Sequence, residues 1–170
     1  MASFNVSIND DNILENDEDF ILTIMRGTLP DGVTRDGDGQ ATVTIVDDDD
    51  VTVRFSETTY SFNEGTGHAQ PALVVSNPSS TDITVLVRDT QNTATRGVDY
   101  NSGPYTVTLT AGMTMASFNV PINDDDILEN DEDFTLSIRS DTLPNRVTRL
   151  GSGRSTVTIV DVDILKWTCL

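Results

Sequence analysis

The stretch that decides the fold is residues 115–138, MASFNVPINDDDILENDEDFTLSI. Apolar and polar residues alternate in two runs, from Phe118 to Ile122 and from Phe134 to Ile138, and an acidic segment separates them. Alternation with a period of two is typical of β-strands that bury one face. The stretch therefore predicts two strands joined by an acidic loop.

The same alternation extends outward from this stretch, and turn-forming residues lie between the runs. No window shows the sustained 3.6-residue apolar stripe of a helix. About seven short strands in roughly 110 residues predict an all-β fold, an antiparallel β-sandwich. The further strands are expected at Val51–Phe55, Tyr60 with Phe62, Leu73 with Val75, Val85 with Val87, Tyr105–Leu109, and Val157 with Ile159.

The chain contains an internal repeat at an offset of 114 residues. Residues 1–50 match residues 115–164 at 35 of 50 positions, far beyond chance. We predict that residues 1–50 are the C-terminal half of one module, that residues 51–163 are a complete module, and that residues 164–170 are a divergent tail. Because residue 1 corresponds to the middle of a module, we expect the chain to begin inside a longer tandem array or to have lost its front.

Half a sandwich leaves open strand edges and an uncovered apolar face. We therefore expect residues 1–50 to pair with another chain, to pack on the neighbouring module, or to be an artefact of truncation.

The charge of the chain excludes several classes of function. Asp and Glu number 28 against 10 Lys and Arg, which gives a net charge of −18. Such a chain lacks the basic surface that nucleic acids and anionic membranes require, and it has no apolar run long enough for membrane insertion. His68 and Cys169 are the only residues of their types, so a disulfide framework and a cysteine zinc site are excluded, and catalysis based on histidine has little to work with.

The acidic residues of the complete module gather at strand ends and in loops. They lie at Glu64, at Asp99, between Asp124 and Asp133, and at Asp161 with Asp163. The loops of a sandwich cluster at its two ends, so separate segments can converge there. Converging carboxylates repel one another unless cations neutralise them, and Ca²⁺ takes six to eight oxygen ligands. Acidic loops that only maintain solubility are the alternative, and charge alone leaves both open.

Several motifs together resemble the Calx-beta family, over the complete module and the back half of its neighbour. They are Glu64-Gly65 after Tyr60-Ser61-Phe62, then Gly97-Val98-Asp99-Tyr100, Ile122-Asn123-Asp124-Asp125-Asp126, and Val157-Thr158-Ile159-Val160-Asp161. The resemblance implies an immunoglobulin-like antiparallel β-sandwich of about seven strands, here a tandem repeat with a truncated first copy. It also implies a site for several calcium ions at one tip.

The resemblance also implies which residues bind the metal. In the complete module they are Glu64, Asp99, Asp124, Asp125, Ile127 through its carbonyl, Glu129, Glu132, Asp161 and Asp163. Val162 departs from the family's closing aspartate triplet, which would lower metal occupancy. The first copy lacks counterparts of Glu64 and Asp99, so its site would be partial, formed by Asp10, Asp11, Ile13, Glu15, Glu18, Asp47, Asp48 and Asp49.

From these observations we expect a non-enzymatic, calcium-binding structural repeat of an extracellular or cell-surface adhesion or cell-communication protein, within a larger membrane-associated or secreted protein. Its partners would be Ca²⁺, neighbouring repeats and, in addition, other adhesion proteins or glycans. A cytoplasmic calcium sensor of a sodium/calcium exchanger-like membrane protein is the alternative. A hydrolase using paired carboxylates is a third reading, which would require the acids to line a concave pocket.

Overall fold

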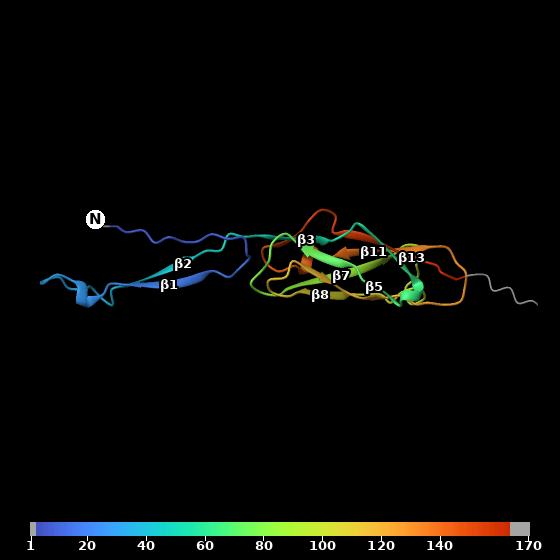
Figure 1. Ribbon diagram of the computed structural model, residues 1–170. Helices are drawn as coiled ribbons and strands as arrows, with labels where there is room; N and C mark the ends of the chain where they lie inside the picture. Colours follow the sequence, from blue (N-terminus) through green and yellow to red (C-terminus); the bar gives the residue numbers. More distant parts are fainter. Residues whose placement is uncertain (1–2, 164–170) are drawn as a thin grey trace, which may run out of the picture.

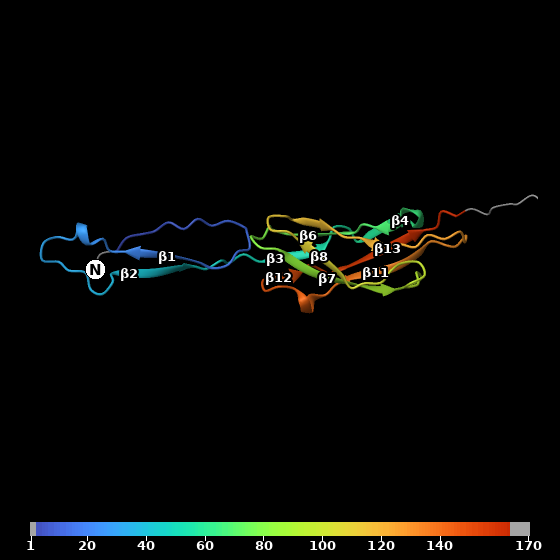
Figure 2. The same cartoon turned by 90° about the horizontal axis from the view of Figure 1, so that it is seen from below.

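The computed structural model describes residues 3–163, and its complete module is a sandwich of two β-sheets (Figure 1 and Figure 2). The predicted tail at 164–170 lies outside the described residues. The strands of the module are β3 (Val51–Phe55), β4 (Thr59–Asn63), β5 (His68–Ala69), β6 (Ala72–Val75), β7 (Ile83–Gln91), β8 (Tyr105–Leu109), β9 (Met115–Ser117), β10 (Val120–Pro121), β11 (Glu132–Ile138), β12 (Val147–Arg149) and β13 (Arg154–Val160).

One sheet has the strand order β4-β13-β11-β7-β8, and the other has the order β12-β3-β6-β9. The pairs β13–β4 and β12–β3 are parallel, and the other pairs within these sheets are antiparallel. The short strands β5 and β10 form a separate antiparallel pair. The all-β sandwich predicted from the alternating runs is confirmed.

The core lies between the two sheets and consists of the apolar residues of the alternating runs. Along β13, for example, Val157 and Ile159 are buried while their neighbours remain partly exposed. Phe134 of β11 is fully buried, and its ring stacks on that of Tyr100 at 4.1 Å between centroids. All the buried apolar residues of this core lie between Val51 and Ile159, so the complete module has a core of its own.

One predicted strand is much shorter than expected. The run from Phe118 to Ile122 was expected to be one strand, but only Val120–Pro121 of it forms a strand, β10, and the short strand β9, which was not predicted, ends just before the run at Ser117. β9 pairs with β6, whereas β10 pairs with β5, so the chain changes partners here. Pro121 has no N–H for a strand ladder, which limits the length of β10. The alternation still predicted correctly that Phe118 and Ile122 face the core.

The short strands β5, β9 and β12 were not predicted, because two or three residues are too few to show a period of two. Three 3-10 helices complete the structure: η1 (Arg26–Thr28), η2 (Glu64–Thr66) and η3 (Ser140–Thr142). Within residues 3–163, no helix has the length and apolar character needed to cross a lipid bilayer.

The first copy forms a two-stranded hairpin that extends away from the sandwich (Figure 1). Its strands are β1 (Glu18–Thr23) and β2 (Gln40–Ile45), and they pair in the same register as β11 and β13. Phe20 pairs with Val43 as Phe134 pairs with Val157. Phe20 remains partly exposed because the described residues place no second sheet over this hairpin.

Candidate metal centre

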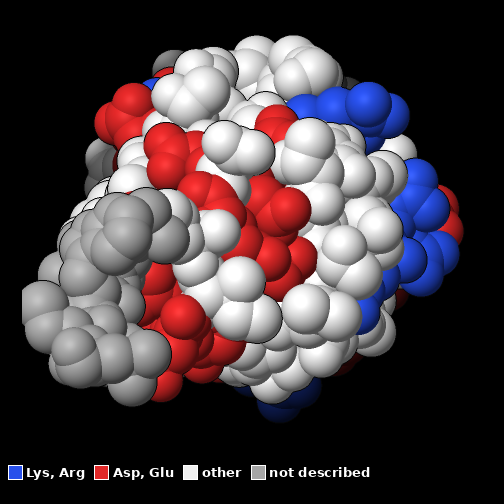
Figure 3. All heavy atoms as spheres, turned by 90° about the vertical axis from the view of Figure 1, so that its right-hand side faces the viewer, with Lys and Arg blue, Asp and Glu red and all other residues white. Residues whose placement is uncertain are grey.

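The acidic segments of the complete module meet at one pole of the sandwich. Because β4 and β13 are parallel, Glu64 at the start of η2 and Asp161 after β13 emerge at the same pole. β11 is antiparallel to β13, so β11 begins at this pole, and the acidic segment that precedes β11 lies there as well. Figure 3 looks onto this end of the molecule, where acidic side chains gather centrally and basic side chains lie toward the rim. The topology therefore brings together residues that are far apart in sequence.

The carboxyl groups at this pole form two groups of three. In each group, one carboxylate oxygen from every residue lies within 4.8 Å of the others. A hydrogen bond of 2.7 Å from the Glu129 amide to Oδ2 of Asp161 connects the groups. The groups are Glu64, Asp161 and Asp163, and Asp99, Glu129 and Glu132.

Each group offers three carboxylate oxygens close enough to contact one cation. Ca²⁺ takes six to eight oxygen ligands, whereas Mg²⁺ usually keeps several waters, so a site rich in carboxylates favours Ca²⁺. Between the groups lies a cavity of about 10 Å³, which is room for about one water molecule. Such a space suits a small ion. Six of the nine predicted ligands lie in the two groups.

The other three predicted ligands lie beside the groups. Asp125 lines the cavity, and its Oδ1 accepts a hydrogen bond of 2.7 Å from the Ile127 amide. Asp124 lies next to η2, where Oδ1 is 3.7 Å from the position that a Cβ on Gly65 would take. The Ile127 side chain is 60% exposed. Neither Asp124 nor Ile127 lines the cavity.

Two asparagines at the site were not predicted. Asn123 and Asn130 both line the cavity with the carboxylates. The Asn123 amide donates to the Asp99 carbonyl at 2.9 Å, and its side-chain Nδ2 donates to the Val98 carbonyl at 2.5 Å. Asn123 therefore holds the loop that carries Asp99. The available signal was its repetition in the first copy, where Asn9 occupies the corresponding position.

Burial and mutual repulsion change the acidity of these carboxyls. Burial, a hydrogen bond with Asp99 and the nearby negative charges raise the pKa of Glu132 to about 7. Burial raises the pKa of Glu64, although the Val162 amide partly offsets this effect. The pKa of Asp161 is lowered because the amides of Asp163 and Glu129 donate to it. Without a cation, the site relieves part of its repulsion by retaining protons.

We expect the calcium-free chain to be more stable at about pH 5.5 than at about pH 8. The pKa of Glu132 is raised from 4.5 to about 7 by folding. Between these values the folded chain holds a proton that the unfolded chain has released, so stability falls as the pH rises toward 7. Melting curves in chelator check this. Glu132→Gln cannot release that proton and should flatten the slope; an unchanged slope would contradict the assignment.

The first copy reproduces the local geometry of the site without closing it. Ile13 donates its amide to Asp11 at 2.8 Å, and Glu15 donates its amide to Asp47 at 3.1 Å, as Ile127 and Glu129 do in the complete module. Among residues 3–163, however, the only groups of three close carboxylates are those of the complete module. The first copy instead has an open cavity of about 360 Å³, whose acidic lining residues are Asp10, Asp11, Glu15, Glu18, Asp47, Asp48 and Asp49.

Comparison with known proteins gives a family and a fold. The model of the Calx-beta domain matches residues 1–49 and again residues 47–163. A search of curated proteins gave no match. Among solved structures, the apo form of the Calx CBD1 domain is 23% identical, with a TM-score of 0.61 over 68% of this chain and 100% of that one.

A second solved structure, CBD12 from CALX1.2, is 24% identical with a TM-score of 0.60. The match covers 66% of this chain but only 46% of that one. Identities at this level show that the fold is shared.

Proposed function

This chain belongs to the Calx-beta family, as one partial and one complete domain, and on this premise we propose that it is a calcium-binding structural repeat of a cell-surface or extracellular adhesion protein. The observation that carries the proposal is the convergence of six carboxyl groups, in two groups of three, at one pole. A related solved structure, CBD12 of CALX1.1, is described as a calcium-binding domain.

The action of calcium would be electrostatic. Two unit charges about 4 Å apart repel by about 4 kcal/mol at an effective dielectric constant near 20. A divalent cation among Asp99, Glu129 and Glu132 removes this repulsion and favours their ionised forms. The loops that carry these residues would then become ordered. The chain needs no catalytic step for this role, and it would be a non-enzymatic module.

Calcium would also stiffen the connection between repeats. Residues 46–50 connect the two copies and contain four successive aspartates, from Asp47 to Asp50. Two of them already contact the complete module: Arg146 donates to Asp47 and, at 3.2 Å, to Asp50. A cation bound among the remaining acidic groups of the first copy would order this junction further.

We expect calcium to bind with measurable heat and to raise the melting temperature. At 100 times the dissociation constant, the stabilisation should be about 2.7 kcal/mol. Glu132→Gln should greatly weaken binding because it removes one of three close carboxylates. Glu57→Gln is the control, since Glu57 is exposed and lies outside both carboxylate groups and outside the acidic cavity of the first copy. Calorimetric titration checks both variants; no heat and no melting shift in the parent chain would refute the proposal.

A cytoplasmic calcium sensor of an exchanger-like membrane protein is the second candidate, favoured by the likeness to the Calx CBD structures. The affinity for calcium separates the two functions. Sensor sites bind with dissociation constants of about 10⁻⁷–10⁻⁵ M, whereas extracellular modules bind at about 10⁻⁴–10⁻³ M. The titration above therefore tests the proposed location: a submicromolar constant would favour the sensor.

A further inference from the structure

The first copy docks on the complete module through Leu14. The Leu14 amide donates to the Pro78 carbonyl at 3.1 Å, and the Leu14 carbonyl accepts from the Ser80 amide at 3.0 Å and from the Ser79 hydroxyl at 3.1 Å. The side chain of Leu14 is partly buried and packs against the core of the module. One residue of the first copy therefore combines backbone pairing with apolar contact.

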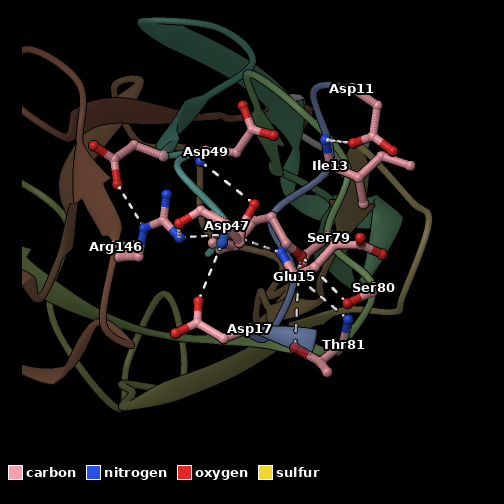
Figure 4. Close-up of polar contacts among 12 residues, drawn as sticks. Asp11, Ile13, Glu15, Asp17, Asp47, Asp49, Ser79, Ser80, Thr81 and Arg146 are labelled. Atoms are coloured by element: carbon pink, nitrogen blue, oxygen red, sulfur yellow. Dashed lines mark hydrogen bonds and ion pairs between the residues drawn. The ribbon is translucent and has the colours of Figure 1, made fainter. Parts of the chain in front are cut away.

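Arg146 of the complete module provides a second contact at this junction (Figure 4). Its guanidinium donates to the Asp47 carbonyl at 2.7 Å and to the Asp47 carboxylate, and it also donates to Asp50. The receiving surface, which we call the near pole, thus consists of the Pro78–Ser80 loop and Arg146.

The opposite pole of the complete module presents the same docking elements. Leu128 corresponds to Leu14, and it lies in the same turn, because Asp125 caps the Ile127 amide as Asp11 caps that of Ile13. Within residues 3–163, Leu128 forms no hydrogen bond, and its side chain is 49% exposed. We call Leu128 and Asp161 together the far tip.

We propose that the far tip is a docking surface for a further module of the same kind. That module would present a loop like Pro78–Ser80 to the backbone and side chain of Leu128, and an arginine like Arg146 to Asp161. The occupant follows from the first junction of the chain. There Leu14 and Asp47, which correspond to Leu128 and Asp161, contact the near pole of the complete module. The inference rests on the repeat-array part of the proposed function, but it does not require a bound metal.

The test extends the chain by one module. A second copy of residues 50–163 is joined directly after Asp163, so that the order Asp161-Val162-Asp163-Asp50-Val51 reproduces the spacing of Asp47 to Val51 at the first junction. The appended module carries its own complete core. Hydrogen exchange of the Ser80 amide in the appended module then reports docking, because this amide is the one that would donate to Leu128.

We expect Leu128→Ser to speed exchange at the appended Ser80 roughly tenfold, because the variant keeps the accepting carbonyl but loses the apolar side chain that packs against the module. Leu14→Ser should act in the same way on Ser80 of the first module. Ile127→Ser is the matched control, because its counterpart Ile13 makes no hydrogen bond to the module. Equal exchange at the appended Ser80 in the parent and the Leu128→Ser chain would overturn the inference.

Calcium titration of the Leu128→Ser chain separates this inference from the proposed function. Leu128 offers no side-chain oxygen, so calcium binding should be unchanged. Docking without calcium binding would refute the proposed function and leave the inference intact. Calcium binding together with equal exchange at the appended Ser80 in the parent and the Leu128→Ser chain would refute the inference and leave the proposed function intact.

Discussion

Phe134→Ala should lower the free energy of unfolding of the complete module by about 3–5 kcal/mol. Phe134 is fully buried between the sheets and stacks on Tyr100, so its removal leaves a cavity and deletes an aromatic contact. Denaturant unfolding followed by circular dichroism checks the change. The slope of the transition should remain that of the parent chain, because the same surface unfolds.

Phe20→Ala provides the matched control for this experiment. Phe20 occupies the same position in the first copy and pairs with Val43 in the same register, but it is only partly buried. We expect the variant to change the stability of the complete module by less than about 0.5 kcal/mol, as for a surface substitution. An equal loss in both variants would show that the hairpin is part of the module's cooperative unit.

Asp89→Ala should destabilise the module by about 2–4 kcal/mol, because it leaves buried donors without an acceptor. Asp89 of β7 is 6% exposed and accepts from Arg96 at 2.5 Å, from the Tyr100 hydroxyl at 3.0 Å and from the Gly103 amide at 2.9 Å. Burial alone would raise the pKa of Asp89, but these hydrogen bonds outweigh it and lower the pKa. The stability that Asp89 provides is therefore present at neutral pH and lost as the pH falls below about 4.

Asp141→Ala is the control for Asp89→Ala. Asp141 also pairs with an arginine, Arg139, at 2.5 Å, but both side chains are well exposed. Exposed ion pairs contribute about 0–1 kcal/mol, so this variant should unfold almost as the parent chain does. Thermal melts of both variants at neutral pH compare them directly. Equal stability of the two would contradict a structural role for the Asp89 network.

The sequence predicts the sandwich well because one physical signal governs it. Residues such as Phe134 and Val157 alternate with polar neighbours, and burial of one face is what a sandwich requires. The convergence of Glu64 with Asp161 was also predictable, since strand ends meet at a pole. The resemblance to a known family added which carboxylates to expect there.

Other features could not be predicted, because they depend on contacts between distant segments that leave no periodic pattern in the sequence. Asp89 lies within an alternating strand, and nothing local indicates that Arg96 and Tyr100 return to it. Leu14 lies in an acidic loop, where its apolar character does not show that it packs against another module. Both features arise from the arrangement of distant segments, and they require coordinates.

The short connection between the copies has a consequence for folding fidelity. Residues 1–50 and 115–163 are similar enough to compete for the same partner strands, β4 and β7. For the first copy to capture them, Ile45 would have to take the place of Ile159 at the far pole, while Val51 remained at the near pole. The nine residues of β7 span about 30 Å, whereas the six steps from Ile45 to Val51 reach at most about 22 Å. The short connection therefore prevents residues 1–50 from replacing residues 115–163 within the same polypeptide. The front half of the complete module pairs with its own C-terminal half.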